Sequence, residues 1–274
     1  MAGRDCALVA FGSSPPLIVL TNDDGVSSPG LAALKAALDP LGDVQAIAPD
    51  HNRSGAARSI TMHSPLWVEE VDLPDGSRAY STDGTPVDCV RMAALGLLDR
   101  KPDLIVSGIN LGENLGDDIT YSGTVAAALE GIVLDIPAIA LSAEGYHAGY
   151  DLDVPARFAR QLVSFVLTQG FPTKTLLNVN VPDRPWEALA GARLTVLGKR
   201  IYGDKVEYRE TRGSRRVYHI YNDELSWHRE EGTDFEAIAE GWVSITPLHF
   251  DLMSHEALDQ LRGWEGALDC WKRT

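Results

Sequence analysis

The first 185 or so residues alternate short apolar runs with segments in which apolar side chains recur every three or four positions. Leu17 to Thr21 is such an apolar run, and Leu31 and Leu34 begin the next segment behind Ser28-Pro29. The first pattern is typical of a buried strand, and the second of a helix with one buried face, here with a serine cap. Alternation of the two predicts a mostly parallel α/β sheet. The expected strands are 17–21, 44–48, 104–107, 136–141 and 176–181, and the expected helices begin near 29, 86, 123 and 154.

The pattern changes after Pro182. Alternating, aromatic and β-rich segments follow, which are typical of hairpins rather than of crossover units. These segments are 193–202, 205–210 and 216–221. An earlier hairpin is expected around Pro74-Asp75-Gly76, with its two strands at 66–71 and 78–81. A further strand at 242–247 and a final helix at 254–263 are expected. We therefore predict a flexible leader (1–16), a core (17–185) and a β-rich extension (186–274) that returns to the core, together one domain.

Composition and charge exclude several classes of function. The formal net charge of −15 disfavours a nucleic-acid polymer as partner, because such binding depends on neutralising many phosphates. It leaves single nucleotides open, since a bound cation inverts the field inside one pocket. No apolar run approaches the roughly 20 residues that cross a bilayer, and 7–12 is too short for a signal-peptide core. The three cysteines are odd in number and far apart, which indicates a reducing compartment, the cytoplasm.

Polar side chains follow three of the expected strands. Ligands of an open α/β sheet bind beyond the carboxyl ends of its strands. Asp23-Asp24 follows the first strand, Asn52 to Gly55 follows the second, and Asn110 with Asn114 follows the strand that ends at Ser107. The three loops therefore predict one site, with Asn52 as a candidate substrate contact.

Asp23 and Asp24 are the most informative residues of that site. Two adjacent carboxylates at the end of a buried strand repel each other unless a cation neutralises them, and Mg²⁺ and Mn²⁺ prefer oxygen ligands. The alternative is that one carboxylate caps a helix while the other points to water, in a common Asp-Gly turn. Ser54 and Asn110 offer neutral oxygens that would complete a coordination shell, although each also suits a plain turn.

Ser122-Gly123-Thr124 opens a helix of small residues. Free N–H groups and the helix dipole make a helix N-terminus a phosphate cradle, and glycine allows close approach of an anion. The alternative is that Ser122 is an ordinary N-cap. No serine, cysteine or histidine nucleophile stands beside a base, which leaves a cation-activated water as the natural attacker on a phosphoryl group.

The chain contains five ordered sequence blocks around the expected loops and helix starts. The blocks are Thr-Asn-Asp-Asp-Gly-Val-x-Ser-Pro-Gly-Leu (21–31), Ala-Pro-Asp-x-Asn-Arg-Ser-Gly (48–55), Gly-Thr-Pro-Val-Asp-Cys-Val (84–90), Ser-Gly-Ile-Asn-x-Gly-x-Asn-Leu-Gly (107–116) and Tyr-Ser-Gly-Thr-Val-Ala-Ala-Ala-x-Glu-Gly (121–131). In this order they are similar to the signature of the SurE family, the stationary-phase survival-protein nucleotidases. The resemblance runs from about 17 to 254.

The resemblance implies a Rossmann-like, mostly parallel sheet with helices on both faces and a β-hairpin-rich C-terminal extension that joins subunits into a homodimer or homotetramer. It implies a 5′-nucleotidase, a hydrolase that converts nucleoside 5′- and also 3′-monophosphates to nucleoside and phosphate, with short polyphosphate as a further substrate. It places one Mg²⁺ or Mn²⁺ per subunit. The implied metal ligands are Asp23, Asp24, Ser54 and Asn110, with Asp23 and Asp24 catalytic, and the implied phosphate contacts are Asn114, Ser122, Gly123 and Thr124.

Two alternatives to this function stay open on the sequence. Asp83-Gly84-Thr85 resembles the end of a phosphoaspartyl phosphatase motif, but Ser81 stands where that motif has its nucleophilic aspartate. A helix cap is the other interpretation of Thr85. The second alternative is a non-enzymatic, Mg²⁺-binding receiver-like module, which would need an acceptor aspartate at the end of its third strand. Asp103 instead lies at the start of a strand.

Overall fold

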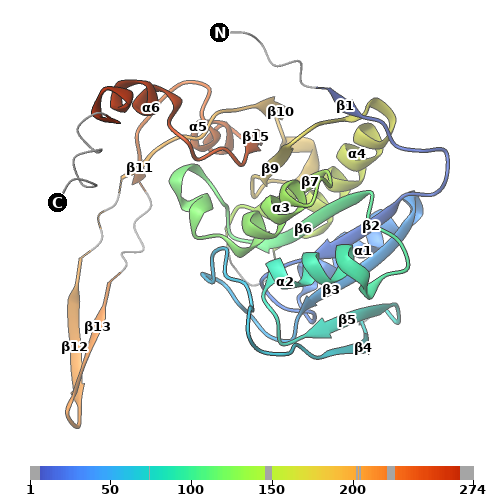
Figure 1. Ribbon diagram of the computed structural model, residues 1–274, viewed down its shortest axis with the longest axis horizontal. Helices are drawn as coiled ribbons and strands as arrows, with labels where there is room; N and C mark the ends of the chain where they lie inside the picture. Colours follow the sequence, from blue (N-terminus) through green and yellow to red (C-terminus); the bar gives the residue numbers. More distant parts are fainter. Residues whose placement is uncertain are drawn as a thin grey trace.

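A sheet of nine strands forms the centre of the protein (Figure 1). The computed structural model describes residues 7–265 apart from 74, 146–149, 202, 204 and 221–225. Within these residues the strand order is β10-β15-β9-β7-β6-β2-β3-β5-β4. The strands are β2 (Leu17–Thr21), β3 (Asp43–Pro49), β4 (Val68–Asp72), β5 (Arg78–Thr82), β6 (Leu104–Leu111), β7 (Ala138–Ala143), β9 (Thr175–Val181), β10 (Gly191–Leu194) and β15 (Trp242–His249).

The middle of this sheet is parallel, as the alternation of strands and helices predicted. β2 pairs in parallel with β3 on one side and with β6 on the other, and the parallel ladder continues through β7 to β9. The expected early hairpin is confirmed, because β4 pairs antiparallel with β5. The carboxyl ends of β3, β2, β6, β7 and β9 therefore lie on the same side of the sheet, where the predicted site residues follow.

Helices cover both faces of the sheet. The helices α1 (Pro29–Leu38) and α4 (Asp153–Gln169) pack together on one face, and α2 (Pro86–Met92) and α3 (Gly123–Val133) pack together on the other. Two apolar cores result, one around Leu20 and Leu34 under α1, the other around Val19 and Val125 under α3. Neighbouring residues of β2 thus face opposite cores, as expected of a strand buried on both sides. The predicted fold class is confirmed.

Polar caps set the start of the helices that border the site. The hydroxyl groups of Ser28, Thr85 and Ser122 accept backbone N–H bonds from the first turns of α1, α2 and α3. Each satisfies a donor that has no partner within its own helix. The predicted starts of these helices are therefore confirmed.

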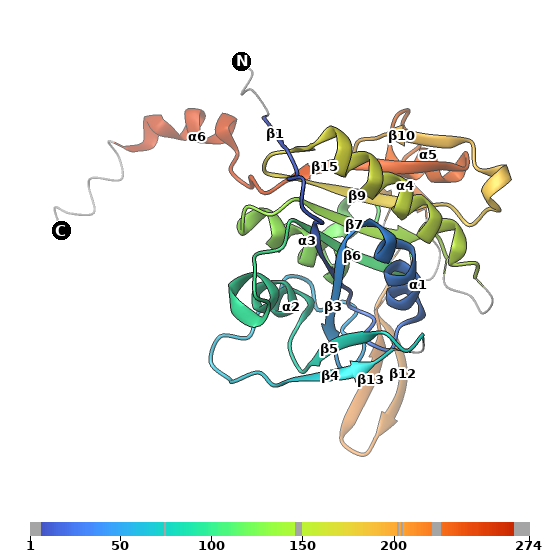
Figure 2. The same cartoon turned by 90° about the vertical axis from the view of Figure 1, so that its right-hand side faces the viewer.

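Part of the extension returns to the sheet, and part projects from it. β10 joins the sheet edge beside β15, and the hairpin of β12 (Glu207–Arg212) and β13 (Arg215–His219) points away from the body in both views (Figures 1 and 2). A small two-stranded sheet pairs β11 (Arg200–Ile201) with β14 (Ser226–Trp227). Two helices follow, α5 (Asp234–Ala239) and α6 (His255–Leu261).

The structure corrects three expectations. β6 continues to Leu111, so the expected loop after Ser107 begins as strand, and its pairing with β7 is irregular between Ser107 and Asn110. β10 runs parallel to β15, a crossover pairing and not the hairpin that its alternation suggested, because alternation does not encode the direction of a partner strand. The helix α5 was not predicted, because a helix of only six residues shows little hydrophobic periodicity. Tyr202 and Tyr221, the ends of two expected strands, lie outside the described residues.

Residues 7–16 take a defined place against the core. Within this part of the expected leader, β1 (Leu8–Val9) pairs antiparallel with β8 (Phe171–Pro172). Residues 1–6 lie outside the described residues. In the part of the chain that is described, no helix combines the length and the apolar character that crossing a membrane requires.

Candidate active site

Asp23 lies where β2 ends, with its carboxylate against the start of α3. It is 3% exposed, and the Thr124 hydroxyl donates to its Oδ1 over 2.5 Å. A Cβ added to Gly123 would lie 2.7 Å from Asp23 Oδ2, so only glycine permits this approach. Burial raises the pKa of Asp23, while the Thr124 hydroxyl and the backbone N–H groups of Gly123 and Thr124 oppose that shift. The helix start thus stabilises a buried negative charge.

Asp24 keeps one carboxylate oxygen without a partner. The Asn52 side-chain amide donates to Asp24 Oδ1 over 3.3 Å, whereas Oδ2 is buried and accepts no hydrogen bond. Burial, and then the neighbouring charge of Asp23, raise the pKa of Asp24 to about 6, and the Leu111 N–H opposes the shift. A buried acceptor without a donor is costly. The described protein groups therefore leave one oxygen of this carboxylate pair without a hydrogen-bond donor.

Ser54 and Asn110 are each linked to Asp24 through one other residue. The Ser54 N–H donates to Asn52 Oδ1 over 2.7 Å, and Asn52 in turn contacts Asp24. The Asn110 side-chain amide donates to Gly112 O over 2.7 Å. Asn110 directly precedes Leu111, whose N–H faces Asp24. The structure thus brings all three predicted strand-end loops together, and the start of α3 with them.

Asn114 belongs to a buried amide network deeper in the fold. Its side chain donates to Ser142 Oγ over 2.7 Å, and its backbone N–H donates to Asn180 Oδ1 over 2.8 Å. The side chains of Asn178 and Asn180 both donate to Asn114 O. These interactions fix the loop after β6. The sequence interpretation missed Ser142, Asn178 and Asn180, although two amides two positions apart in an apolar strand are a signal of a buried polar network.

The start of α3 differs in detail from the predicted phosphate cradle. The Ser122 hydroxyl accepts from the Val125 N–H over 3.1 Å and is a helix cap, the second of the two interpretations of this residue. The N–H groups of Gly123 and Thr124 face the Asp23 carboxylate. The Asp23 carboxylate therefore contacts the same helix N-terminus at which the phosphate was expected to bind.

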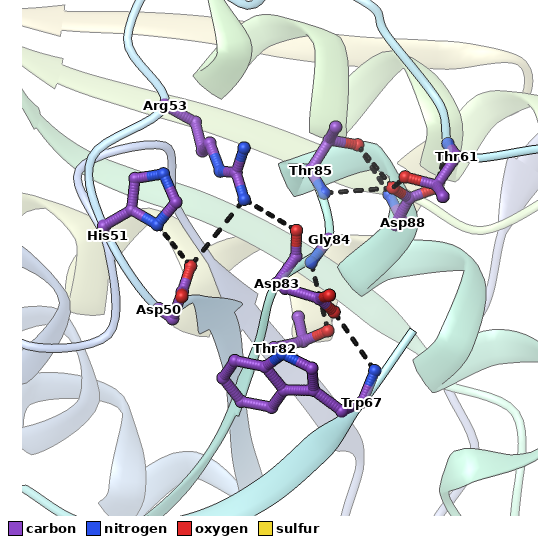
Figure 3. Close-up of polar contacts among 10 residues, drawn as sticks. All are labelled: Asp50, His51, Arg53, Thr61, Trp67, Thr82, Asp83, Gly84, Thr85 and Asp88. Atoms are coloured by element: carbon purple, nitrogen blue, oxygen red, sulfur yellow. Dashed lines mark hydrogen bonds and ion pairs between the residues drawn. The ribbon is translucent and has the colours of Figure 1, made fainter. Parts of the chain in front are cut away.

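The loop after β3 is tied to the next strand and helix (Figure 3). The Arg53 N–H donates to Asp23 O over 2.6 Å, and its guanidinium donates to Asp83 O over 2.7 Å. Further along, Thr61 donates to Asp88 through its N–H at 3.0 Å and its hydroxyl at 2.8 Å. Asp88 also completes a capping box with Thr85, which confirms the cap interpretation of Thr85. The loop that carries Asn52 and Ser54 is thus held on both sides.

A buried glutamate of α3 also holds the loop after β3 in place. Glu130, whose side chain is 2% exposed, contacts Arg58 and Arg91 at 2.6 Å each through its two oxygens. Arg58 comes from the loop and Arg91 from α2. A buried carboxylate needs such partners, and two arginines satisfy it while joining three segments. The sequence interpretation did not single out these three residues.

The donor set around Asp23 and Asp24 suits a hard cation. No cluster of three or more histidine, cysteine or acidic side chains arranged for a metal occurs among the described residues, which disfavours a zinc-type centre there. The acid pair instead has neutral side chains beside it, the Thr124 hydroxyl on Asp23 and the Asn52 amide on Asp24, and its carboxylate oxygens are the kind of ligand that Mg²⁺ and Mn²⁺ prefer. The unpartnered Asp24 Oδ2 is the observation in this structure that such an ion would explain.

Comparisons with known proteins give one consistent result. A family model described as "Survival protein SurE" matches residues 18–204. The 5′-nucleotidase SurE of Rubrobacter xylanophilus is 48% identical over 258 residues, which cover 90% of this chain and 97% of that protein. That of Chloroflexus aggregans is 49% identical over 249 residues, covering 90% and 98%. The crystal structure of the SurE protein from Aquifex aeolicus superposes with a TM-score of 0.81 at 43% identity, covering 91% of this chain and all of that one.

Asp24→Asn should stabilise the cation-free protein at pH 8. The pKa of Asp24 rises from 3.8 to about 6 on folding, so ionisation of this carboxyl lowers the free energy of unfolding as the pH climbs through that interval. The neutral amide escapes this penalty, and its advantage should shrink as the pH falls from 8 towards 5. Thermal unfolding in EDTA across this range is the measurement. The exposed Asp99→Asn variant is the control, and a gain that does not change with pH would contradict the assignment.

Proposed function

The chain belongs to the SurE family and is an enzyme of the 5′-nucleotidase type, and we propose that it hydrolyses nucleoside monophosphates to nucleoside and phosphate with one divalent cation, Mg²⁺ or Mn²⁺, per subunit. One observation carries the cation in this proposal. Asp23 is buried and Asp24 is half-buried, their carboxylates are adjacent after the end of β2, and the buried Asp24 Oδ2 accepts no hydrogen bond. A cation would compensate both the repulsion and the missing partner.

The residues that would hold the cation are Asp23, Asp24, Ser54 and Asn110. When bound, a divalent cation supplies Lewis acidity and neutralises charge on phosphoryl oxygens. The chain's own groups prepare this arrangement. The Thr124 hydroxyl and the first turn of α3 orient the Asp23 carboxylate, and the Asn52 amide orients that of Asp24. Such supporting contacts limit the freedom of ligands that would otherwise move apart.

The substrate phosphate is assigned to neutral donors around the acid pair. These are the side-chain amides of Asn52 and Asn114 and the first turn of α3, namely Ser122, Gly123 and Thr124. Neutral donors stabilise the charge that spreads over the equatorial oxygens during phosphoryl transfer without adding a further fixed charge. A water molecule attacks phosphorus in line with the leaving oxygen, and the P–O bond to the nucleoside breaks. The water oxygen stays on the phosphate, one of its protons passes overall to the nucleoside oxygen, and nucleoside and phosphate leave.

The proposed substrates include nucleoside 3′-monophosphates and short polyphosphate besides 5′-nucleotides. The support is the family resemblance, together with a site whose assigned groups all act on the phosphate and its cation. We place the reaction in the cytoplasm. The buried Cys89 is a free thiol, which agrees with a reducing compartment.

The two alternatives receive less support. A phosphoaspartyl mechanism centred on Asp83 lacks its nucleophile, and the Asp83 carboxylate accepts the Trp67 N–H over 3.1 Å instead. A receiver-like module needs an acceptor aspartate beside the acid pair. Asp103 lies at the opposite, amino end of β6, where it accepts the Leu17 N–H over 2.8 Å and pairs with Arg100.

Asp23→Ala should abolish cation-dependent phosphate release from nucleoside 5′-monophosphates, because it removes one of the two charges that would hold the ion. The assay is phosphate release from a panel of 5′- and 3′-nucleotides and short polyphosphate, first in EDTA and then with Mg²⁺ or Mn²⁺ restored. Asp99→Asn, an exposed substitution, should match the unaltered protein. Retained activity of Asp23→Ala would refute the role of this carboxylate.

Thr124→Val should weaken the apparent affinity for the activating cation by about 10-fold or more, the usual effect of removing a hydrogen bond to a metal ligand. Valine keeps the shape of threonine but cannot donate to Asp23 Oδ1. Thr124→Ser restores the hydroxyl and should restore affinity, which separates the hydrogen bond from packing. Titration of activity with Mn²⁺ is the measurement, and equal affinities for the valine and serine variants would contradict the assignment.

Assembly into a homodimer or homotetramer is part of the proposal, and exposed apolar side chains of the extension support it. Leu252 is 86% exposed and Trp264 is 62% exposed, and Leu258 and Leu261 of α6 are also exposed. Apolar side chains gathered on one segment mark an interaction surface. Light scattering on the purified protein should give a mass of two or four chains of 29.7 kDa, and a mass of one chain at micromolar concentration would exclude this assembly.

A further inference from the structure

Asp234, the first residue of α5, is a buried carboxylate that the proposed reaction does not use. It is 0% exposed. Its Oδ2 accepts the Gly116 N–H over 2.8 Å, and its Oδ1 accepts the Gly198 N–H over 2.8 Å and the Phe235 N–H over 3.0 Å. Two of these donors come from segments 118 and 36 residues away along the chain. The carboxylate therefore joins three separate parts of the protein.

A helix-capping role does not account for Asp234. Thr233 is the N-cap of α5, and its hydroxyl accepts the Glu236 N–H. Only the Phe235 N–H belongs to the helix that Asp234 begins. Burying a charged carboxylate is costly unless hydrogen bonds replace its water, and here most of that replacement comes from Gly116 and Gly198. The contacts with these two glycines are thus the feature to be explained.

Gly116 belongs to the loop between β6 and α3, two residues after Asn114 and six before Ser122. Its φ is +51°, and an added Cβ would lie 2.6 Å from both Gly198 O and the Phe235 ring. Next to it, Leu115 packs in a small apolar cluster with Phe235 and Ile238. The loop therefore fits closely against the extension, and no side chain at position 116 would allow the same contact.

A second contact ties the same loop to the extension. Arg200 of β11 pairs with Asp118 at 2.7 Å, within the 3₁₀ turn Gly116–Thr120 that leads into α3. Figure 1 shows this turn beside β11, on the side of α3 that faces the extension. Both contacts act between Asn114 and the first turn of α3, the two places assigned to the substrate phosphate.

We propose that Asp234 is a positioning residue that sets the distance between Asn114 and the first turn of α3 and so shapes the phosphate subsite. This inference rests on the proposed function, which places the phosphate between those groups. It makes the extension part of the catalytic apparatus of its own chain. Asp23 and Asp24 follow β2, and Asn52 lies in the loop after β3, so Asp234 acts more directly on the phosphate contacts than on these two carboxylates.

Asp234→Asn tests the proposal, because the amide keeps the shape of the carboxylate but presents an NH₂ group to a backbone N–H. One of the two glycine contacts is then lost. The inhibition constant of inorganic phosphate and the KM for a nucleoside 5′-monophosphate, both at saturating Mn²⁺, should rise about 10-fold or more, since displacements near 1 Å have large effects on catalytic positioning. Mn²⁺ binding measured by electron paramagnetic resonance without substrate should weaken by a clearly smaller factor than phosphate binding, because Asp23 and Asp24 lie outside the Gly116–Thr120 turn that Asp234 holds.

Arg193→Gln is the matched control. It removes the ion pair of Arg193 with Glu240, a contact at 2.9 Å that lies within the extension. It should leave phosphate inhibition unchanged. Arg200→Gln is the second variant, because it loosens the same loop through a less buried contact. It should raise the inhibition constant of phosphate in the same direction by a smaller factor, and it decides the question if Asp234→Asn fails to fold.

Three results would overturn the proposal. The first is a folded Asp234→Asn protein with unchanged phosphate inhibition and KM. The second is an equal loss of Mn²⁺ binding and phosphate binding, which would indicate a general structural role. The third is an Arg200→Gln protein that matches Arg193→Gln. An unaltered protein that releases no phosphate from nucleotides would instead refute the proposed function, so the two failures are distinguishable.

Discussion

Desolvation of two neighbouring carboxylates, together with the repulsion between them, governs this site. Asp23 and Asp24 follow a strand that is buried on both faces, and Asp23 is buried while Asp24 is half-buried. The first turn of α3 and the Thr124 hydroxyl compensate Asp23, while Asp24 has the Asn52 amide on one oxygen and no partner on the other. Two neighbouring carboxylates with incomplete hydrogen bonding are expected where a protein holds a cation, because each carboxylate is attracted to the ion and their mutual repulsion is offset.

The rest of the fold holds the surroundings of this pair in place. Parallel strands deliver three polar loops to one edge of the sheet, and each loop is then fixed by long-range polar contacts. Asp88 and Glu130 anchor the loop after β3, Asn180 fixes the start of the loop after β6, and Asp234 fixes its later part. Contacts with distant parts of the chain therefore hold the loops that carry the proposed ligands, which suits chemistry that depends on positioning.

Sequence patterns predicted the sheet, its helices and the convergence of the strand-end loops, because these follow from local periodicity and one topological rule. Ser28, Thr85 and Ser122 could be identified as caps for the same reason. The contacts that hold the loops could not be predicted. Asp234 and Gly116 are 118 positions apart, and nothing local at either residue specifies the other. The parallel pairing of β10 with β15 escaped prediction likewise, since alternation of side chains does not reveal the partner strand. The SurE resemblance named the candidate site residues, but not the carboxylates that hold their loops.

The central claim is that one divalent cation lies between the carboxylates of Asp23 and Asp24. Anomalous diffraction at the manganese absorption edge, from crystals grown with Mn²⁺, tests this claim most directly. A single strong anomalous peak per subunit within coordination distance of both carboxylates, about 2.0–2.4 Å, is predicted. Crystals saturated with Mn²⁺ that diffract well and show no peak beside these carboxylates would contradict the account.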